Sequence, residues 1–209
     1  MNYDAIENEH GLRHDPFKAI VSPRPISWIS TLDAEGRANL APYSFFNAVS
    51  DNPHIVMFSS IGWKHSVANV EATSEFVCNL ATHALRDQMN ESSAPFEAGV
   101  SEFEKTGLTL VASSVVKPPR VGEAPIALEC RHLQTIRLED VEGKFADRWM
   151  VLGQVVSIYI DNAVIHDGLI DITELCPLAR FGYRDYSVVY EVFQMVRPAG
   201  GGGEKSGAA

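Results

Sequence analysis

The sequence is poor in positive charge and has no long apolar run. Its 209 residues include 17 Lys and Arg against 27 Asp and Glu, which gives a formal net charge of −10. Nucleic-acid binders need a basic face, and anionic membranes attract basic segments, so we expect neither partner. No apolar run is long enough to span a bilayer, and the N-terminus, MNYDAIENEHGLR, has no apolar signal core. We therefore expect a cytoplasmic protein.

Cysteines and common phosphate-binding motifs are also scarce. The three cysteines, Cys78, Cys130 and Cys176, are widely spaced and form no CxxC pair, which favours buried thiols over disulfides or metal ligands. His10 and His14 lie four residues apart in a polar N-terminal segment, and we expect no metal site there. The sequence contains neither GxxxxGK[ST] nor GxGxxG, which excludes a Walker loop and a dinucleotide fingerprint.

Strand-like segments dominate what is present. They are expected at Ala19–Val21, Ile26–Leu32, Ala38–Ala41, His54–Ser60, Glu75–Ala81, Leu108–Val116, Ile126–Ile136, Trp149–Ile160 and Val188–Phe193. Helices are expected at His65–Thr73, Leu85–Glu91, Glu102–Thr106 and Leu175–Arg180. Because the strands do not alternate with helices, the pattern predicts a mainly β fold, an antiparallel barrel with a few peripheral helices.

The chain reads as one domain with two extensions. We expect an N-terminal arm over residues 1–16, a barrel domain over 17–198 and a flexible Gly-rich tail over 199–209, within RPAGGGGEKSGAA. Asp33–Gly36 joins two strands as a hairpin, and Gly36 can take a positive φ there.

The third expected strand contains an anomaly, NLAPYSFFNAVS (Asn39–Ser50). Pro42 cannot donate to a strand ladder, so it belongs at an edge or a bulge. The opened backbone needs partners, and a planar heterocycle with donors and acceptors on its edge could satisfy them. Aromatic and polar side chains around Pro42 could wall such a ring. The alternative interpretation is an aromatic core cluster at a β-bulge.

A second segment, SSIGWKHS, ends a strand in Ser59 and Ser60 and opens a helix at Lys64 and Ser66. A helix N-terminus offers unpaired N–H groups and the positive end of the dipole. With hydroxyls and an ammonium nearby, the segment predicts a site for a phosphate. The alternative is that Ser66 only caps the helix and Lys64 is solvated.

The two segments together resemble the flavin reductase-like group of FMN-binding split-barrel proteins. The motifs that carry the resemblance are Ser30-Thr31, Gly36…Asn39…Ala41-Pro42-Tyr43-Ser44, Asn52-Pro53, Lys64-His65-Ser66…Asn69-Val70, Glu75-Phe76-Val77…Asn79, Pro125…Leu128-Glu129-Cys130, Gly153-Gln154-Val155 and Pro177-Leu178-Ala179-Arg180-Phe181-Gly182. Each motif is loose, but their order and spacing together are specific, and they cover roughly Phe17 to Pro198.

The resemblance implies a Greek-key split β-barrel that forms a homodimer with FMN near the interface. The implied phosphate and ribityl contacts are Ser59, Ser60, Lys64 and Ser66, with Thr31 and Asn39 near the ribityl chain or ring edge. The implied ring contacts are the backbone of Ala41, Pro42, Tyr43, Ser44 and Phe45, with Arg180 and Tyr183 completing the pocket. Interface candidates are the aromatic segments Tyr43–Phe46 and Phe181–Tyr186.

The chain departs from the family pattern at two positions. His65 stands where Asp often follows the Lys, which is compatible with phosphate binding. Trp149, in Asp147-Arg148-Trp149, stands where many reductases of the family have a His that faces the flavin and nicotinamide. Trp149 and His166 are the candidate catalytic residues, although His166 before Asp167-Gly168 is more simply read as a turn residue.

Three functions follow from the sequence. The first is an FMN-dependent oxidoreductase, an NAD(P)H:flavin reductase that uses NADH or NADPH and delivers electrons to free flavin, to oxygen, or to a flavin-dependent oxygenase or another redox partner. The second is an FMN-carrying electron-transfer protein, like a flavoredoxin, without its own reductase activity; Trp149 in place of His favours it. The third is a split-barrel structural or regulatory protein that binds no flavin.

Overall fold

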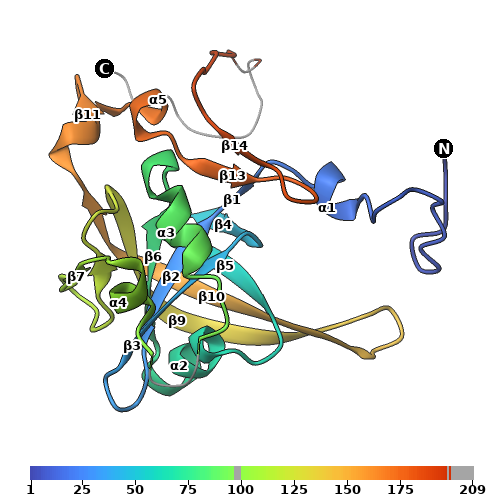
Figure 1. Cartoon of the computed structure of the whole chain (residues 1–209), viewed down its shortest axis with the longest axis horizontal. Coiled ribbons are helices and arrows are strands. Elements are labelled where there is room, and N and C mark those ends of the chain that lie inside the picture. Colours follow the sequence, from blue (N-terminus) through green and yellow to red (C-terminus); the bar gives the residue numbers. More distant parts are fainter. Residues whose placement is uncertain (97–99, 197, 199–209) are drawn as a thin grey trace.

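The computed structural model describes residues 1–96, 100–196 and 198, and it is mostly strand (Figure 1). Its helical elements are α1 Phe17–Ile20, α2 His65–Thr73, η1 His83–Leu85, α3 Arg86–Glu91, α4 Glu102–Thr106, η2 Asn162–Val164 and α5 Ile172–Leu175. Its strands are β1 Arg24–Pro25, β2 Ser27–Leu32, β3 Ala38–Tyr43, β4 Phe46–Asp51, β5 His54–Ile61, β6 Glu75–Leu80, β7 Leu110–Val111, β8 Arg120–Val121, β9 Ile126–Glu139, β10 Phe145–Ile160, β11 Ile165–His166, β12 Leu169–Ile170, β13 Leu178–Arg180 and β14 Tyr186–Val188.

One antiparallel sheet of seven strands, in the order β3-β2-β6-β9-β10-β5-β4, makes the body of the molecule. The chain passes directly from one edge strand, β3, to the other, β4, through Ser44 and Phe45. The backbone N–H of Ser59 donates to the carbonyl of Phe45 (2.8 Å), which continues the β4–β5 ladder by one residue. Strand β3 also lies close to β5, the neighbour of the other edge strand, without pairing with it. The result is the expected split barrel, a curled sheet whose seam stays open.

Helix α2 connects β5 to β6 and passes over the β9–β10 pair, a Greek-key connection. It packs on β2, β3 and β9. The buried face of α2, with Val67 and Val70, joins Ile29, Phe58 and Phe76 in one core cluster. Trp28, the neighbour of Ile29, faces a second core cluster with Phe103 of α4, because successive side chains of a strand point to opposite faces. Strand β2 is therefore buried on both faces, which fixes β3 and α2 relative to each other.

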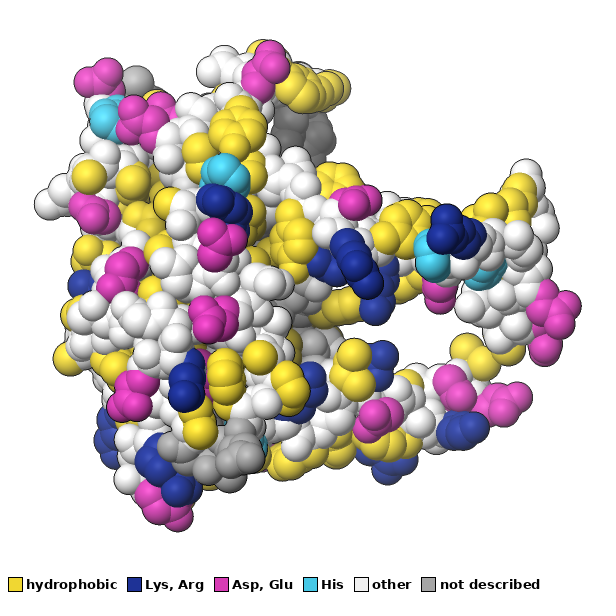
Figure 2. Space-filling view, in the orientation of Figure 1, with side chains coloured by type: hydrophobic (Ala, Val, Ile, Leu, Met, Phe, Trp, Pro, Cys, Tyr) yellow, Lys and Arg dark blue, Asp and Glu magenta, His cyan; other side chains and the backbone are white. Residues whose placement is uncertain are grey.

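Two segments project from the barrel. The N-terminal segment before α1 and the long β9–β10 hairpin extend in the same direction, and an open gap separates them in the space-filling view (Figures 1 and 2). The predicted tail, 199–209, lies outside the described residues. Within the part of the chain that the structure describes, no helix has the length and apolarity needed to cross a membrane.

Several expected elements are confirmed. The hairpin at Asp33–Gly36 forms, with Gly36 at φ 82°. Helices α2 and α4 have the predicted bounds, and β9 and β10 form where strands were expected.

Four expected elements are wrong in type or extent. Residues 19–21 are not a strand, because α1 begins after Pro16, where the Asp15 carboxylate accepts from the N–H of Phe17 (2.8 Å). The predicted helix over 175–180 lies earlier, as α5, and Cys176, with φ 47°, ends it before β13 begins. Within the predicted strand 108–116, only the two residues of β7 form a strand. The predicted strand 188–193 is replaced by β14, which ends at Val188.

One strand of the seven-stranded sheet, β4, was missed, and so were the short strands β1, β8, β11, β12 and β13 outside it. Strand β4 pairs with β5, but its side chains are mostly exposed and show no apolar alternation.

Candidate functional site

A cavity of about 560 Å³ lies where the end of β3 meets the beginning of α2. This is within the size range of cofactor sites, about 300–1,000 Å³. Most of the predicted cofactor-binding residues line it: Asn39, Ala41, Pro42, Tyr43, Ser44, Phe45, Ser59, Lys64 and Ser66. The two segments singled out in the sequence are therefore opposite walls of one cavity.

The N-terminus of α2 forms the polar wall. Lys64 is the N-cap residue, its side chain makes no capping hydrogen bond, and the first turn contains no acidic residue. The first N–H groups of the helix therefore have no side-chain acceptor from the cap, and the dipole adds partial positive charge. The buried hydroxyl of Ser66 accepts a hydrogen bond from the Asn39 side-chain amide (3.2 Å). This wall is suited to an anionic group such as a phosphate.

The free edge of β3 forms the opposite wall. The N–H of Leu40 donates to the carboxylate of Glu102 (3.1 Å), so Leu40 directs its backbone away from β2 and toward the free edge. Alternate residues of an antiparallel strand direct their backbone groups to the same side, so Pro42 also faces that edge. Pro42 has no N–H, but the β2–β3 ladder loses no hydrogen bond, because that position faces the free edge. The carbonyl of Pro42 is an available acceptor at the same edge. The backbone does not leave its ladder at Pro42, since Tyr43 still pairs with Ser27.

Tyr43, which lines the cavity, has a buried hydroxyl. Its ring packs on Phe58 with the centroids 4.8 Å apart, and its hydroxyl has no hydrogen-bond partner within the described part of the chain. Burial raises the pKa of Tyr43, and the neighbouring hydroxyls of Ser66 and Ser60 oppose that shift. A buried hydroxyl without a partner is destabilising, and a polar ligand in the cavity could satisfy it.

Three predicted site residues do not line this cavity. Thr31 is buried behind α2, where its hydroxyl accepts from the Asn69 amide (3.0 Å). Ser60 is buried as well, and its hydroxyl donates to the carbonyl of Gly62 (3.1 Å). Both therefore position α2 and the loop before it. Arg180 lines a smaller neighbouring cavity of about 250 Å³, together with Pro42.

The two catalytic candidates also lie outside the cavity wall. Trp149 is half-buried beside Trp63 and Phe145, at ring-centroid distances of 4.7 and 5.4 Å. Of these three, Trp63 lines the cavity. His166 lies on β11, where its ring hydrogen-bonds Glu174 (2.6 Å), and it lines none of the three cavities described here.

Other lining residues were not predicted. They are Lys18, Ile61, Trp63, His65, Glu102 and the segment Ser92–Phe96 that follows α3. The small-residue run Ser92-Ser93-Ala94-Pro95 signals a loop. Nothing in the local sequence indicates that this loop returns to β3.

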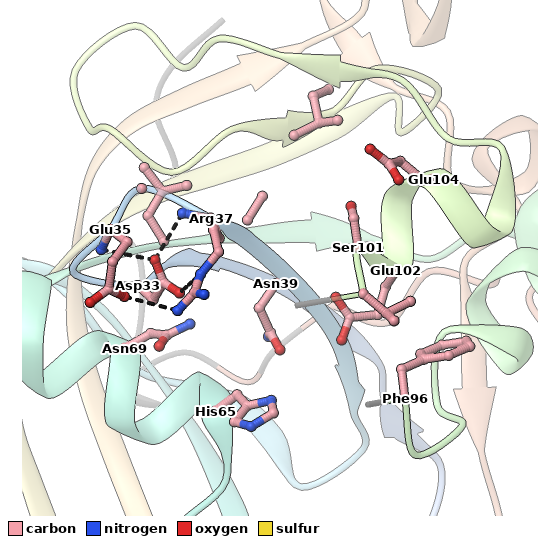
Figure 3. A pocket seen from close by; sticks show the side chains of 15 residues that line it. Asp33, Glu35, Arg37, Asn39, His65, Asn69, Phe96, Ser101, Glu102 and Glu104 are labelled. Carbon is pink, nitrogen blue, oxygen red and sulfur yellow. Dashed lines mark hydrogen bonds and ion pairs between the residues drawn. The ribbon is translucent and has the colours of Figure 1, made fainter. Parts of the chain in front are cut away.

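A third cavity, of about 570 Å³, continues from the first one and shares Asn39, His65, Phe96 and Glu102 with it. Figure 3 shows His65 from α2 and Glu102 from α4 on either side of Asn39. On the exposed hairpin that also lines this cavity, Arg37 is paired with Asp33 (2.6 Å) and Glu35 (2.9 Å). Burial raises the pKa of Glu102, against the lowering effect of its backbone hydrogen bonds and of His65.

The chain is similar to known proteins both in sequence and in structure. A family model described as "Flavin reductase like domain" matches residues 21–178. An uncharacterized protein of Aquifex aeolicus is 33% identical over 173 residues, which cover 80% of this chain and 85% of the relative.

Two solved structures are similar over nearly the whole chain. Nitrilotriacetate monooxygenase component B from Bacillus cereus is 28% identical, with a TM-score of 0.85 and coverage of 93% of this chain and 98% of the other. 2-Nitrobenzoate 2-nitroreductase NbaA from Pseudomonas fluorescens is 25% identical, with a TM-score of 0.83 and coverage of 95% and 97%.

Proposed function

The chain belongs to the flavin reductase-like domain family, and from this premise we propose that it binds FMN between β3 and α2 and reduces it with NADH or NADPH. The flavin-related oxidoreductase character follows from the family. The identity of the flavin, the nicotinamide donor and the contacts of individual residues are the proposal.

The observation that carries the proposal is the meeting of Lys64 and Ser66 with the free edge of β3 in one cavity. Lys64, Ser66 and Ser59 would hold the phosphate, with the first N–H groups of α2. The carbonyl of Pro42, at the free edge, would accept from the ring N–H of the flavin. The unpartnered hydroxyl of Tyr43 supports this fit, because a bound polar group would supply its missing partner.

FMN supplies the hydride-accepting chemistry when it is bound. The chain's contribution is orientation: the edge of β3 fixes the ring, and α2 fixes the phosphate. Phe45 and Trp63 are exposed aromatic residues of the same cavity, and they would cover the ring and exclude water. No side-chain acid is needed for hydride transfer itself, so the distance of His166 from the cavity is compatible with the reaction.

The alternative proposal is an FMN-carrying electron-transfer protein without its own NAD(P)H reductase activity. One observation favours it: position 149 is Trp, and its ring packs between Trp63 and Phe145 instead of lining the cavity. The two proposals share the FMN site and differ only in whether nicotinamide reaches the ring.

We also propose that the protein acts as a homodimer with FMN near the interface and supplies electrons to a partner. The gap between the N-terminal segment and the β9–β10 hairpin offers a place for a second copy (Figure 2). The similarity to a monooxygenase component supports a flavin-dependent oxygenase as the electron acceptor. Sedimentation at micromolar concentration is expected to give twice the chain mass, and a monomer would contradict the dimer.

The test of the function is a visible absorption spectrum of the purified protein, recorded anaerobically before and after addition of NADH and then of NADPH. Bleaching of a flavin spectrum by either nicotinamide supports the reductase and identifies its donor. A flavin that dithionite bleaches but neither nicotinamide does supports the electron carrier. A colourless protein that also fails to take up added FMN would overturn both proposals.

A further inference from the structure

The cavity of about 250 Å³ beside the proposed flavin site has an unusual charge. It lies across the wall formed by Pro42, Ser44 and Phe45, which also line the flavin cavity. Three cationic residues line it, Lys18, Arg24 and Arg180, and no carboxylate does. None of the three is in an ion pair within the described part of the chain. In a chain of net charge −10, this concentration of unpaired positive charge creates a local attraction for anions.

Arg24 is the buried member of the group. Its side chain donates to the carbonyls of Lys18, Val21 and Phe181, and the residue is only 7% exposed. Its Nε has no partner among the described residues. A buried cation is costly unless an opposite charge accompanies it, and the carbonyl dipoles compensate only part of that charge.

Arg180 is held in place before any ligand arrives. Its guanidinium donates to the carbonyl of Tyr183 (2.7 Å) and lies over the ring of Tyr186, 4.3 Å from the centroid. Burial lowers the pKa of Arg24, and the positive charge of Arg180 lowers it further, so the two guanidinium groups repel each other. An anion between them would relieve that repulsion.

We propose that this cavity is an anion subsite that binds the carboxylate or phosphate of the second substrate. The reactive end of the same substrate then lies in the neighbouring flavin cavity, on the other side of Pro42–Phe45. The cavity is smaller than sites that enclose a whole ligand, about 300–1,000 Å³, and suits one charged end group. The anion could be a phosphate of the nicotinamide donor or the carboxylate of an organic acceptor. The part played by the flavin rests on the proposed function, whereas anion binding does not.

The first experiment measures anion binding by titration calorimetry, with inorganic phosphate and with benzoate, on protein saturated with FMN. Arg180→Gln is expected to weaken binding about tenfold or more, because a charge-assisted hydrogen bond is lost. Lys18→Gln, at an exposed position that carries little risk to folding, is expected to weaken it less. Arg184→Gln is the matched control, since Arg184 lies exposed in the same loop and does not line the cavity.

The outcomes separate this proposal from the FMN site. Binding of phosphate alone assigns the subsite to the donor: an increased KM for NADPH but not for NADH in Arg180→Gln assigns it to the 2′-phosphate, and an increase for both assigns it to the pyrophosphate. Binding of benzoate assigns it to a carboxylate acceptor.

Equal affinities in Arg180→Gln and Arg184→Gln overturn the subsite, as does an absence of binding. If phosphate binding responds to Ser66→Ala and not to Arg180→Gln, the anion lies at α2, which overturns the subsite and supports the FMN site. If the protein takes up no FMN, the proposed function fails, and the same titration without FMN still tests the subsite.

Discussion

The side-chain amide of Asn39, on β3, donates a hydrogen bond to the hydroxyl of Ser66, in the first turn of α2, with 3.2 Å between the two atoms. This bond joins the two walls of the proposed flavin cavity. Because the Ser66 oxygen accepts from Asn39, its own hydrogen remains available to a ligand. In the proposed site, Asn39, which also lines the cavity, would therefore orient the Ser66 hydroxyl to donate to the phosphate.

Replacing Ser66 tests this orientation. Ser66→Ala is expected to weaken FMN binding about tenfold or more, because a hydrogen bond to a charged group contributes about 1.5–3 kcal/mol. The measurement is a titration of FMN fluorescence quenching. Thr73→Ala is the matched control, since it removes a hydroxyl from the other end of α2, where Thr73 donates to the carbonyl of Asn69. An equal loss in both variants would mean that α2 is perturbed generally and that Ser66 has no specific role.

Lys64 should act mainly through its charge. The residue is exposed at the N-cap of α2, so its attraction for a phosphate is screened by salt. Lys64→Met is expected to weaken FMN binding by up to about fivefold at low ionic strength, and the difference from the unmodified protein should shrink as salt is added. The check is the FMN dissociation constant measured at several salt concentrations. Lys144→Met, in the exposed turn between β9 and β10, should leave it unchanged; a constant difference at all salt concentrations would argue against a charge effect.

The sequence predicted those parts of the site whose signals are local. The helix start at Lys64–Ser66 and the edge position of Pro42 depend on neighbouring residues only, and both are found in the structure. Their meeting in one cavity could be inferred only because the family resemblance linked the two segments. Glu102 and Ser92–Phe96 were missed because α3 and α4 bring them to β3 by packing, for which the local sequence has no signal.

The strand predicted over residues 108–116 was wrong for a similar reason. The run LTLVASSVV has strong strand propensity, but the buried carboxylate of Glu129 accepts the N–H groups of Ser114, Val115 and Val116 at 2.6–3.1 Å. A side chain on β9 thus takes hydrogen bonds that a neighbouring strand would otherwise receive. Propensity cannot reveal a partner that lies more than ten residues away in the sequence.

Glu102 should make stability depend on pH. Burial raises its pKa above the ordinary 4.5, so in the folded state it keeps its proton to a higher pH than in the unfolded state. Below the unfolded pKa both states are protonated. As pH rises from there through the folded pKa, the unfolded state loses its proton first, so the free energy of unfolding falls, and above the folded pKa the loss stays constant.

Glu102→Gln removes this ionisation and keeps an oxygen for the N–H of Leu40. The variant is therefore expected to gain melting temperature relative to the unmodified protein at pH 7 and to gain less at pH 4. Parallel thermal melts across this range provide the measurement. Glu104→Gln, an exposed neighbour on α4, is the control and should show no such trend. The contrary result would be a melting temperature that, relative to the unmodified protein, is lower at pH 7 than at pH 4. It would show that the charged form of Glu102 stabilises the fold.

Gly153 on β10 is a position in the barrel interior that has no room for a side chain. A Cβ at this position would lie 2.3 and 2.5 Å from two ring carbons of Phe76, which is fully buried and packs edge-on against Phe58. Gly153→Ala therefore forces either the ring or strand β10 to move. Overpacking of this kind costs about 1–3 kcal/mol, which for a chain of this size lowers the Tm by about 3–10 °C.

A double-mutant cycle with Phe76→Leu identifies the cause of that loss. Phe76→Leu alone is destabilising because it leaves space in the core, but the methyl group that Gly153→Ala adds would occupy part of that space. The double variant should therefore lose less stability than the sum of the losses in the two single variants. We expect this difference, the coupling free energy, to be at least about 0.5 kcal/mol. The measurement is chemical denaturation of the four proteins. Strict additivity would place the strain elsewhere, at the carbonyl of Arg131, which the same Cβ would approach to 3.3 Å.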